Sequence, residues 1–135
     1  MIKKKLLIIV PARGGSTGLK NKNILKLGSK PLLYYSLKAG SLIKEKSKKI
    51  ICSTDSEKIK NIVKKLGYNC PFLRPKKISG KYATDITFVN HAIKFFYSNG
   101  ISFKNGVILR PTAPFRNKKI INNAYNLFKL SKYSS

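Results

Sequence analysis

Short apolar runs alternate with helical periods along the 135-residue chain, and this alternation limits the folds open to it. Residues 6–10 form a continuous apolar run bounded by lysines and a proline, as expected of a strand buried on both faces. Residues 49–52 and 107–109 predict further strands, and residues 69–73 predict a weak one that a proline interrupts. Strands separated by helices form βαβ units, so we expect an α/β domain with a mostly parallel sheet.

Helices are predicted between and after these strands. The first opens at Pro31, because proline is favoured in the first turn of a helix. A later helix is capped by Thr84 or Asp85 and ends at residues 99–100, which are Asn and Gly. A last helix is predicted from residue 118 to about residue 130.

The helix between residues 54 and 67 has the strongest pattern. Thr54 and Glu57 have the spacing of a capping box, although Asp55 could be the N-cap instead. Gly67 is expected to end the helix. An amphipathic stripe with i, i+3, i+4, i+7 spacing lies between these ends: Ile59, Ile62, Val63 and Leu66.

The charge is strongly unbalanced, with 29 Lys and Arg against 4 Asp and Glu and a net charge of +25. One interpretation is nucleic-acid binding, since lysines release counterions from a phosphate backbone. The other is a bias towards residues with A/T-rich codons, because Asn and Ile are also abundant. The lysines are spread along the chain rather than gathered in one stripe, so we favour the second interpretation and expect no specific nucleic-acid partner.

No apolar run approaches the roughly 20 residues that a membrane-spanning helix needs, so we expect no membrane partner. The apolar run after the first lysines is too short for a signal peptide, and no cleavage site follows it. Cys52 and Cys70 stand in no CxxC pair or Cys/His cluster, and we predict small buried hydrophobic side chains. These features predict a cytoplasmic protein.

The segment PARGGSTGLKNKN, residues 11–23, follows the first strand and suits a nucleoside triphosphate. Its glycines allow backbone N–H groups to approach phosphate oxygens. Arg13 and Lys22 supply charge, and Ser16 and Asn23 supply polar orientation. The spacing is neither a Walker A motif nor GxGxxG, and a basic surface turn remains the alternative. Parallel sheets bind ligands beyond the carboxyl ends of their strands, which here adds residues 53–55 and 110–116 to the candidate site.

PARGGSTGLKNKN resembles the signature of the CMP-sialic acid synthetases, or acylneuraminate cytidylyltransferases, which typically show PARGGSKG followed by a Lys-Asn pair. The resemblance continues in order through KPLLYYSLKAG, CSTDSEKI, PFLRPKKISG, TDITFVNHAI and LRPTAPFR, and covers residues 5–130. The ketodeoxyoctonate cytidylyltransferases are the second choice, because their loop usually lacks the paired glycines found here at Gly14 and Gly15.

The resemblance implies a Rossmann-like nucleotidyltransferase domain with helices on both faces of the sheet. Residues 1–135 would form a single domain equal to the N-terminal two thirds of the family's usual length, with the C-terminal part and its homodimer arm missing. The implied reaction joins CTP to a nine-carbon 2-keto sugar acid of the sialic, legionaminic or pseudaminic type, giving a CMP-sugar and pyrophosphate. The alternatives are an inactive remnant that still binds CTP and a basic nucleic-acid-binding module.

The resemblance also implies roles for individual residues. Arg13 and Lys22 would be catalytic, and Arg74 would recognise cytosine together with the backbone near Ala83 and Asp85. The full nucleotide-binding set is Arg13, Gly14, Gly15, Ser16, Lys22, Asn23, Arg74, Ala83 and Asp85. The implied sugar-binding set is Arg110, Thr112, Pro114 and Arg116, in which arginine suits a carboxylate through bidentate pairing.

The chain departs from the family pattern at Thr17, where lysine is usual, at Lys81, where aspartate is common, and at Arg110, where glutamine is usual. The family uses Mg²⁺, and its aspartate ligands are expected beyond Ser135, so we predict no metal ligand in this chain. Asp55 is interpreted as a helix cap rather than a metal ligand.

The remaining candidates for chemistry are given structural roles. Glu45 and Glu57 are predicted to lie on solvated helix surfaces. His91, the only histidine, is predicted to be structural, because no acid or cysteine stands at catalytic spacing from it.

Overall fold

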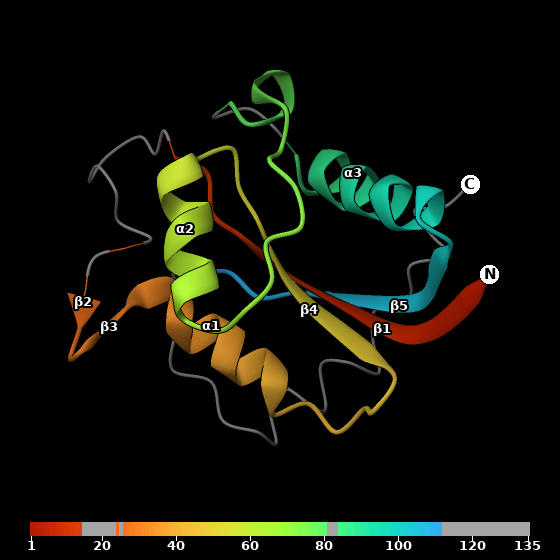
Figure 1. Ribbon diagram of the computed structural model, residues 1–135, viewed down its shortest axis with the longest axis horizontal. Helices are drawn as coiled ribbons and strands as arrows, with labels where there is room; N and C mark the ends of the chain where they lie inside the picture. Colours follow the sequence, from red (N-terminus) through yellow and green to blue (C-terminus); the bar gives the residue numbers. More distant parts are fainter. Residues whose placement is uncertain (15–23, 25, 81–83, 112–135) are drawn as a thin grey trace.

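The computed structural model describes residues 1–14, 24, 26–80 and 84–111 (Figure 1). The predicted helix at 118–130 therefore lies outside the described residues. Within them the elements follow in this order: β1 (Ile2–Pro11), β2 (Lys26–Leu27), β3 (Lys30–Pro31), α1 (Leu32–Ser41), β4 (Lys48–Ser53), α2 (Glu57–Lys65), the short 3-10 helix η2 (Lys76–Ile78), α3 (Asp85–Ser98) and β5 (Ile101–Ile108).

The main sheet has the strand order β4-β1-β5, and both pairings are parallel. At the centre of the register Ile8 of β1 stands beside Ile50 of β4 and Val107 of β5. This arrangement confirms the predicted α/β fold with a parallel sheet. β5 begins at Ile101 rather than at Val107. The sequence did not indicate this first half because it alternates apolar Ile101 and Phe103 with polar residues and so carries no continuous apolar run.

The weak strand predicted at residues 69–73 is wrong as a strand. The described chain forms only a single parallel bridge there, between Ile51 and Asn69. Pro71 cannot donate a backbone hydrogen bond, which explains why the pairing with β4 does not continue.

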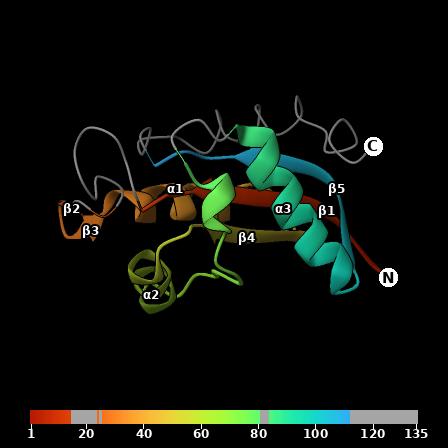
Figure 2. The ribbon, with the colours of Figure 1, turned by 90° about the horizontal axis from the view of Figure 1, so that it is seen from above.

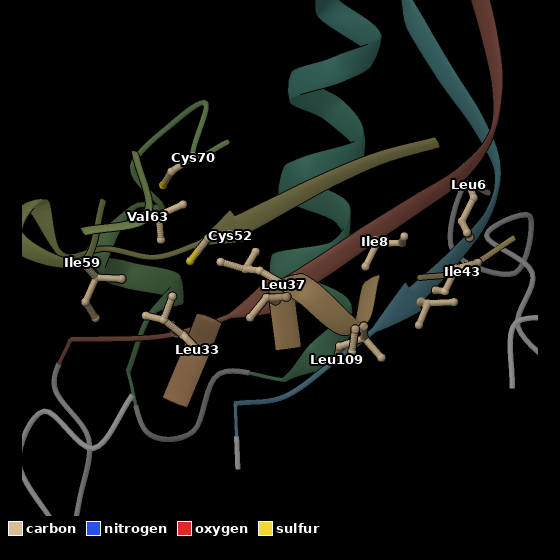
Figure 3. Packing of buried hydrophobic residues seen from close by; sticks show 14 residues of the cluster. Leu6, Ile8, Leu33, Leu37, Ile43, Cys52, Ile59, Val63, Cys70 and Leu109 are labelled. Atoms are coloured by element: carbon tan, nitrogen blue, oxygen red, sulfur yellow. The ribbon is translucent and has the colours of Figure 1, made fainter. Parts of the chain in front are cut away.

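Helices cover both faces of the sheet. Successive side chains of β1 point to opposite faces, and because they are apolar on both faces, each face must be covered. Leu6, Ile8 and Val10 belong to a core cluster with residues of α1 and α2 (Figure 3). Leu7 and Ile9 belong to a second cluster, formed with residues of α3. In Figure 2, α3 lies in front of the strands and α1 behind them. None of the five residues from Leu6 to Val10 is more than 1% exposed.

The helix ends were predicted unevenly. Pro31 is the N-cap of α1, and Thr84 is the N-cap of α3 although its side chain makes no capping hydrogen bond. Gly67 and Gly100 follow the C-caps of α2 and α3 with φ of 87° and 81°, left-handed values that glycine adopts without strain.

The N-cap predicted for α2 is wrong. Neither Thr54 nor Asp55 caps this helix, because Ser56 does so by accepting a hydrogen bond from the backbone N–H of Ile59 at 3.2 Å. The Thr54 hydroxyl instead accepts from the N–H of Ser56. Glu57 lies exposed in the first turn of α2, as predicted, whereas Glu45 lies between α1 and β4, outside a helix.

Helix α1 lies unusually close to the sheet at Gly40. A Cβ placed on Gly40 would lie 3.0 Å from Cγ2 of Ile8 and 3.6 Å from Cδ1 of Leu109. Ile8 is fully buried on the central strand, so it has little room to move away. Gly40 therefore sets the distance between α1 and the sheet.

We expect Gly40→Ala to lower the free energy of unfolding by about 1 kcal/mol, since overpacking of about 1–3 kcal/mol outweighs the helix propensity gained by alanine. Gly80→Ala is the matched control, because nothing lies within 4 Å of its Cβ position. Urea unfolding of both variants measures the difference. A Gly40→Ala variant more stable than the parent would contradict this packing.

Candidate functional site

The carboxyl ends of the three parallel strands meet at one edge of the sheet. β1 ends at Pro11, β4 at Ser53 and β5 at Ile108. Backbone hydrogen bonds continue past these ends, from Ala12 N–H to the Ser53 carbonyl and from Leu109 N–H to the Ile9 carbonyl. The segments that follow the strands are therefore held side by side and form the candidate site, as the rule for parallel sheets predicts.

The segment after β1 is fixed against the start of α2. The N–H of Gly14 donates to Oδ1 of Asp55 at 2.8 Å. A Cβ on Gly14 would lie 2.9 Å from Cβ of Ser56, closer than two such atoms can approach. Glycine at position 14 is thus required by a close approach between two loops.

Asp55 lies in the candidate site, as the position of residues 53–55 predicted, but its role differs from the predicted one. It was interpreted as a helix cap, whereas its carboxylate accepts from a backbone N–H that is 41 residues away in the sequence. The sequence feature that indicates a role in the site is the position of Asp55 directly after a strand of a parallel sheet, because the loops after such strands lie together at one edge of the sheet. Its negative charge also lies close enough to Arg74 to raise the pKa of that guanidinium, against a larger lowering by burial.

Arg74 is buried, with only 4% of its surface exposed. Its Nε donates to the Ser53 hydroxyl at 3.1 Å, and its terminal NH2 nitrogen donates to the Ser53 carbonyl at 2.7 Å. The guanidinium carbon lies 5.0 Å from the centre of the Phe88 ring. Burial lowers the pKa of Arg74, and the nearby Arg13 lowers it further. Arg74 therefore fixes the end of β4 and brings positive charge beneath the site, close to Arg13.

Asp85 and Arg110 form an ion pair across the other side of the site. Asp85 begins α3 and Arg110 follows β5, and both side chains are about half exposed, at 48% and 50%. The Ser36 hydroxyl on α1 donates to the Arg110 carbonyl at 3.0 Å and positions this backbone. An exposed pair of this kind adds little stability, so both side chains can turn towards a ligand at small cost.

The structure therefore brings five of the candidate residues to one edge of the sheet: Arg13, Gly14, Arg74, Asp85 and Arg110. The other candidates lie outside the described residues: Gly15, Ser16, Lys22, Asn23, Ala83, Thr112, Pro114 and Arg116. Two departures from the family pattern, Thr17 and Lys81, also lie outside them.

The described residues do not fit a Mg²⁺ site. Among residues 1–14, 24, 26–80 and 84–111, no group of three His, Cys, Asp or Glu lies close enough to hold a metal ion. The two carboxylates at the site already have partners: Asp55 accepts a hydrogen bond from Gly14, and Asp85 forms an ion pair with Arg110.

His91 packs against Phe72, near Arg74, and has a structural role, as predicted. Its ring meets the Phe72 ring edge-on, with 4.6 Å between the centres. Burial lowers the pKa of His91, and the positive charge of Arg74 lowers it further.

None of the described helices is long and apolar enough to cross a membrane.

Comparison with known proteins finds relatives of this chain. An N-acylneuraminate cytidylyltransferase of Escherichia coli O18:K1:H7 is 37% identical over 133 residues, which are 98% of this chain and 30% of that protein. A pseudaminic acid cytidylyltransferase of Campylobacter jejuni (strain 81-176) is 37% identical over 124 residues, 92% of this chain and 53% of that protein. The chain thus spans about half or less of the length of these relatives.

A solved structure of a CMP:2-keto-3-deoxy-manno-octonic acid synthetase complexed with CTP has the same fold. Its TM-score is 0.73 at 15% identity, over 88% of this chain and 45% of that one. The family model described as Cytidylyltransferase matches residues 7–131. The chain therefore belongs to the cytidylyltransferase family.

Proposed function

We propose that the protein transfers CMP from CTP to a nine-carbon 2-keto sugar acid and releases pyrophosphate, in the cytoplasm where CTP is available. The observation that carries the proposal is the fixed approach of the loop after β1 to the start of α2, made by Gly14 and Asp55 at the carboxyl edge of the sheet. This places Arg13 at the edge where parallel sheets bind nucleotides.

The charge at this edge suits a polyanion. Arg13 lies close enough to Arg74 to add to the lowering of the Arg74 pKa by burial, while the neighbouring Asp55 carboxylate accepts a hydrogen bond from a backbone N–H. A triphosphate would be drawn to this surplus of positive charge. Arg13, together with Lys22, Ser16 and Asn23 from the same loop, would orient the phosphates, and Arg74 with the backbone near Ala83 and Asp85 would form the cytosine pocket.

The chemistry is a displacement at the α-phosphate. The anomeric hydroxyl of the sugar acid attacks that phosphorus and loses its proton to water, and pyrophosphate leaves with the electrons of the broken P–O bond. Such a reaction depends mostly on positioning and on neutralising the charge of the phosphate oxygens, which Arg13 and Lys22 would supply.

The sugar acid would bind next to Arg110. The Arg110 guanidinium can exchange the Asp85 carboxylate for the carboxylate of the sugar, because the ion pair is exposed and contributes little free energy. Thr112, Pro114 and Arg116 follow directly in the sequence and complete the proposed sugar-binding segment.

The first test measures CTP binding. We expect CTP to raise the melting temperature of the protein, and we expect Arg13→Gln/Lys22→Gln to weaken CTP affinity at least about tenfold, since each charge-assisted hydrogen bond contributes about 1.5–3 kcal/mol. The matched control is Lys3→Gln/Lys5→Gln, which removes the same charge from exposed positions at the far end of β1.

Equal CTP affinity in the two double variants would contradict the proposal. Tight polynucleotide binding that weakens steeply with salt and that millimolar CTP does not compete would favour the nucleic-acid-binding alternative instead.

The second test concerns Asp55. We expect Asp55→Ala to weaken CTP affinity severalfold, because it releases the Gly14 N–H, whereas Asp55→Asn keeps an acceptor oxygen and most of the affinity. Ser56→Ala controls for damage to α2, since it removes this cap at a cost of about 1 kcal/mol of stability and leaves the hydrogen bond between Asp55 and Gly14 in place. Calorimetric titration with CTP measures the affinities. An asparagine variant as weak as the alanine variant would show that the hydrogen bond to Gly14 is not the cause.

The third test measures turnover. The protein is incubated with CTP, Mg²⁺ and sialic, legionaminic or pseudaminic acid, and we expect a CMP-sugar from one of the three by mass spectrometry. CTP binding without any CMP-sugar would favour the inactive, CTP-binding alternative and would reject turnover by this chain.

A further inference from the structure

A cavity of about 390 Å³ lies at the outer edge of β4, and none of the candidate site residues lines it. Three of its lining side chains are lysines from β4 and α2, and one is a cysteine. The complete lining is Lys49, Ile51, Lys60, Lys64, Tyr68, Asn69, Cys70, Pro71 and Phe96.

Cys70 in this lining is next to a second cysteine. The parallel bridge between Ile51 and Asn69, with the Cys52 N–H donating to the Asn69 carbonyl at 2.9 Å, places Cys52 and Cys70 side by side. Both thiols are free and buried, and both belong to the core cluster that contains Val63 of α2 (Figure 3). Neighbouring strands lie about 4.8 Å apart, within the Cα separation of about 4.4–6.8 Å that a disulfide can span.

The surroundings make the two thiols unequal. A hydrogen bond from Cys52 lowers the pKa of Cys70, and the positive charges of Lys60 and Lys64 lower it further against the opposing effect of burial. The same hydrogen bond, together with burial, raises the pKa of Cys52. Cys70 is therefore the thiol that ionises first, and of the two cysteines it is the one that lines the cavity, while Cys52 keeps its proton.

We propose that Cys70 and Cys52 form a redox-active pair, which a hydroperoxide entering the lysine-lined cavity oxidises to a disulfide. The Cys70 thiolate attacks the terminal peroxide oxygen and the O–O bond breaks, which leaves a sulfenic acid on Cys70 and releases the alkoxide as an alcohol, or as water when the oxidant is H₂O₂. The Cys52 sulfur then attacks the Cys70 sulfur, and the sulfenic hydroxyl leaves with the Cys52 proton as water. Two thiols are oxidised and one peroxide is reduced.

The cross-link between Cys52 and Cys70 would close a loop that contains the whole of α2. It would also tie Cys70 to β4, just ahead of Phe72 and Arg74. A bond that closes such a loop restricts the unfolded chain, so the oxidised protein is expected to melt at a higher temperature than the reduced one.

The test exposes the parent protein to H₂O₂ together with free cysteine in the same solution. We expect the protein to lose both thiols at least as fast as the free thiol does, and to lose 2 Da with a Cys52–Cys70 cross-linked peptide. In Cys52→Ser, the sulfenic acid should persist on Cys70 and be trapped by dimedone, whereas Cys70→Ser should not react. Protein thiols that stay reduced while free cysteine is consumed would overturn the proposal.

The lysines supply a matched control. Lys60→Gln/Lys64→Gln should slow the oxidation severalfold, because each unit by which the pKa of Cys70 rises reduces its thiolate about tenfold. Lys58→Gln/Lys65→Gln removes two exposed lysines from the same helix and should leave the rate unchanged. Equal rates in the two variants would reject the cavity's role. This comparison keeps both cysteines and remains decisive if a serine variant fails to fold.

Discussion

The burial of β1 on both faces is the constraint on which the rest of the structure depends. Its five central residues are closed off by α1 and α2 on one side and by α3 on the other, while β4 and β5 pair with its two edges. Each such side chain contributes about 1.5–3 kcal/mol when buried. Because both neighbours are parallel to β1, all three strands end at the same edge, and the segments with polar and charged residues are brought together there.

Two close contacts, made at Gly40 and Gly14, position the segments of the site against the core. Gly40 brings α1 against Ile8 and Leu109, and Ser36 on the same helix holds the backbone of Arg110. Gly14 brings the loop after β1 against Ser56. In a chain with only 4 acidic residues, two of them act at this edge: Asp55 holds a loop through its backbone, and Asp85 pairs with an arginine.

The local patterns predicted the elements well, because they depend on neighbours in the sequence. The apolar run of β1, the stripe of α2 and the glycines after α2 and α3 all indicated the right structure. The N-cap of α2 was mistaken, since Thr54, Asp55 and Ser56 are three adjacent residues that can each cap a helix, and only the path of the chain selects Ser56. Partners that are distant in the sequence could not be predicted. No residue near Asp55 in the sequence indicates its hydrogen bond with Gly14, and none near Arg74 indicates its burial in contact with Ser53 and Phe88.

The central claim, that the carboxyl edge of the sheet holds CTP, is tested most directly by amide chemical shifts during titration with the nucleotide. Shifts should concentrate at Gly14, Ser56 and Arg110, while Gly67 and Gly100, which follow the C-termini of α2 and α3, should remain unchanged. Shifts that spread evenly over the lysine-rich surface, or that concentrate at Gly67 and Gly100, would contradict the account.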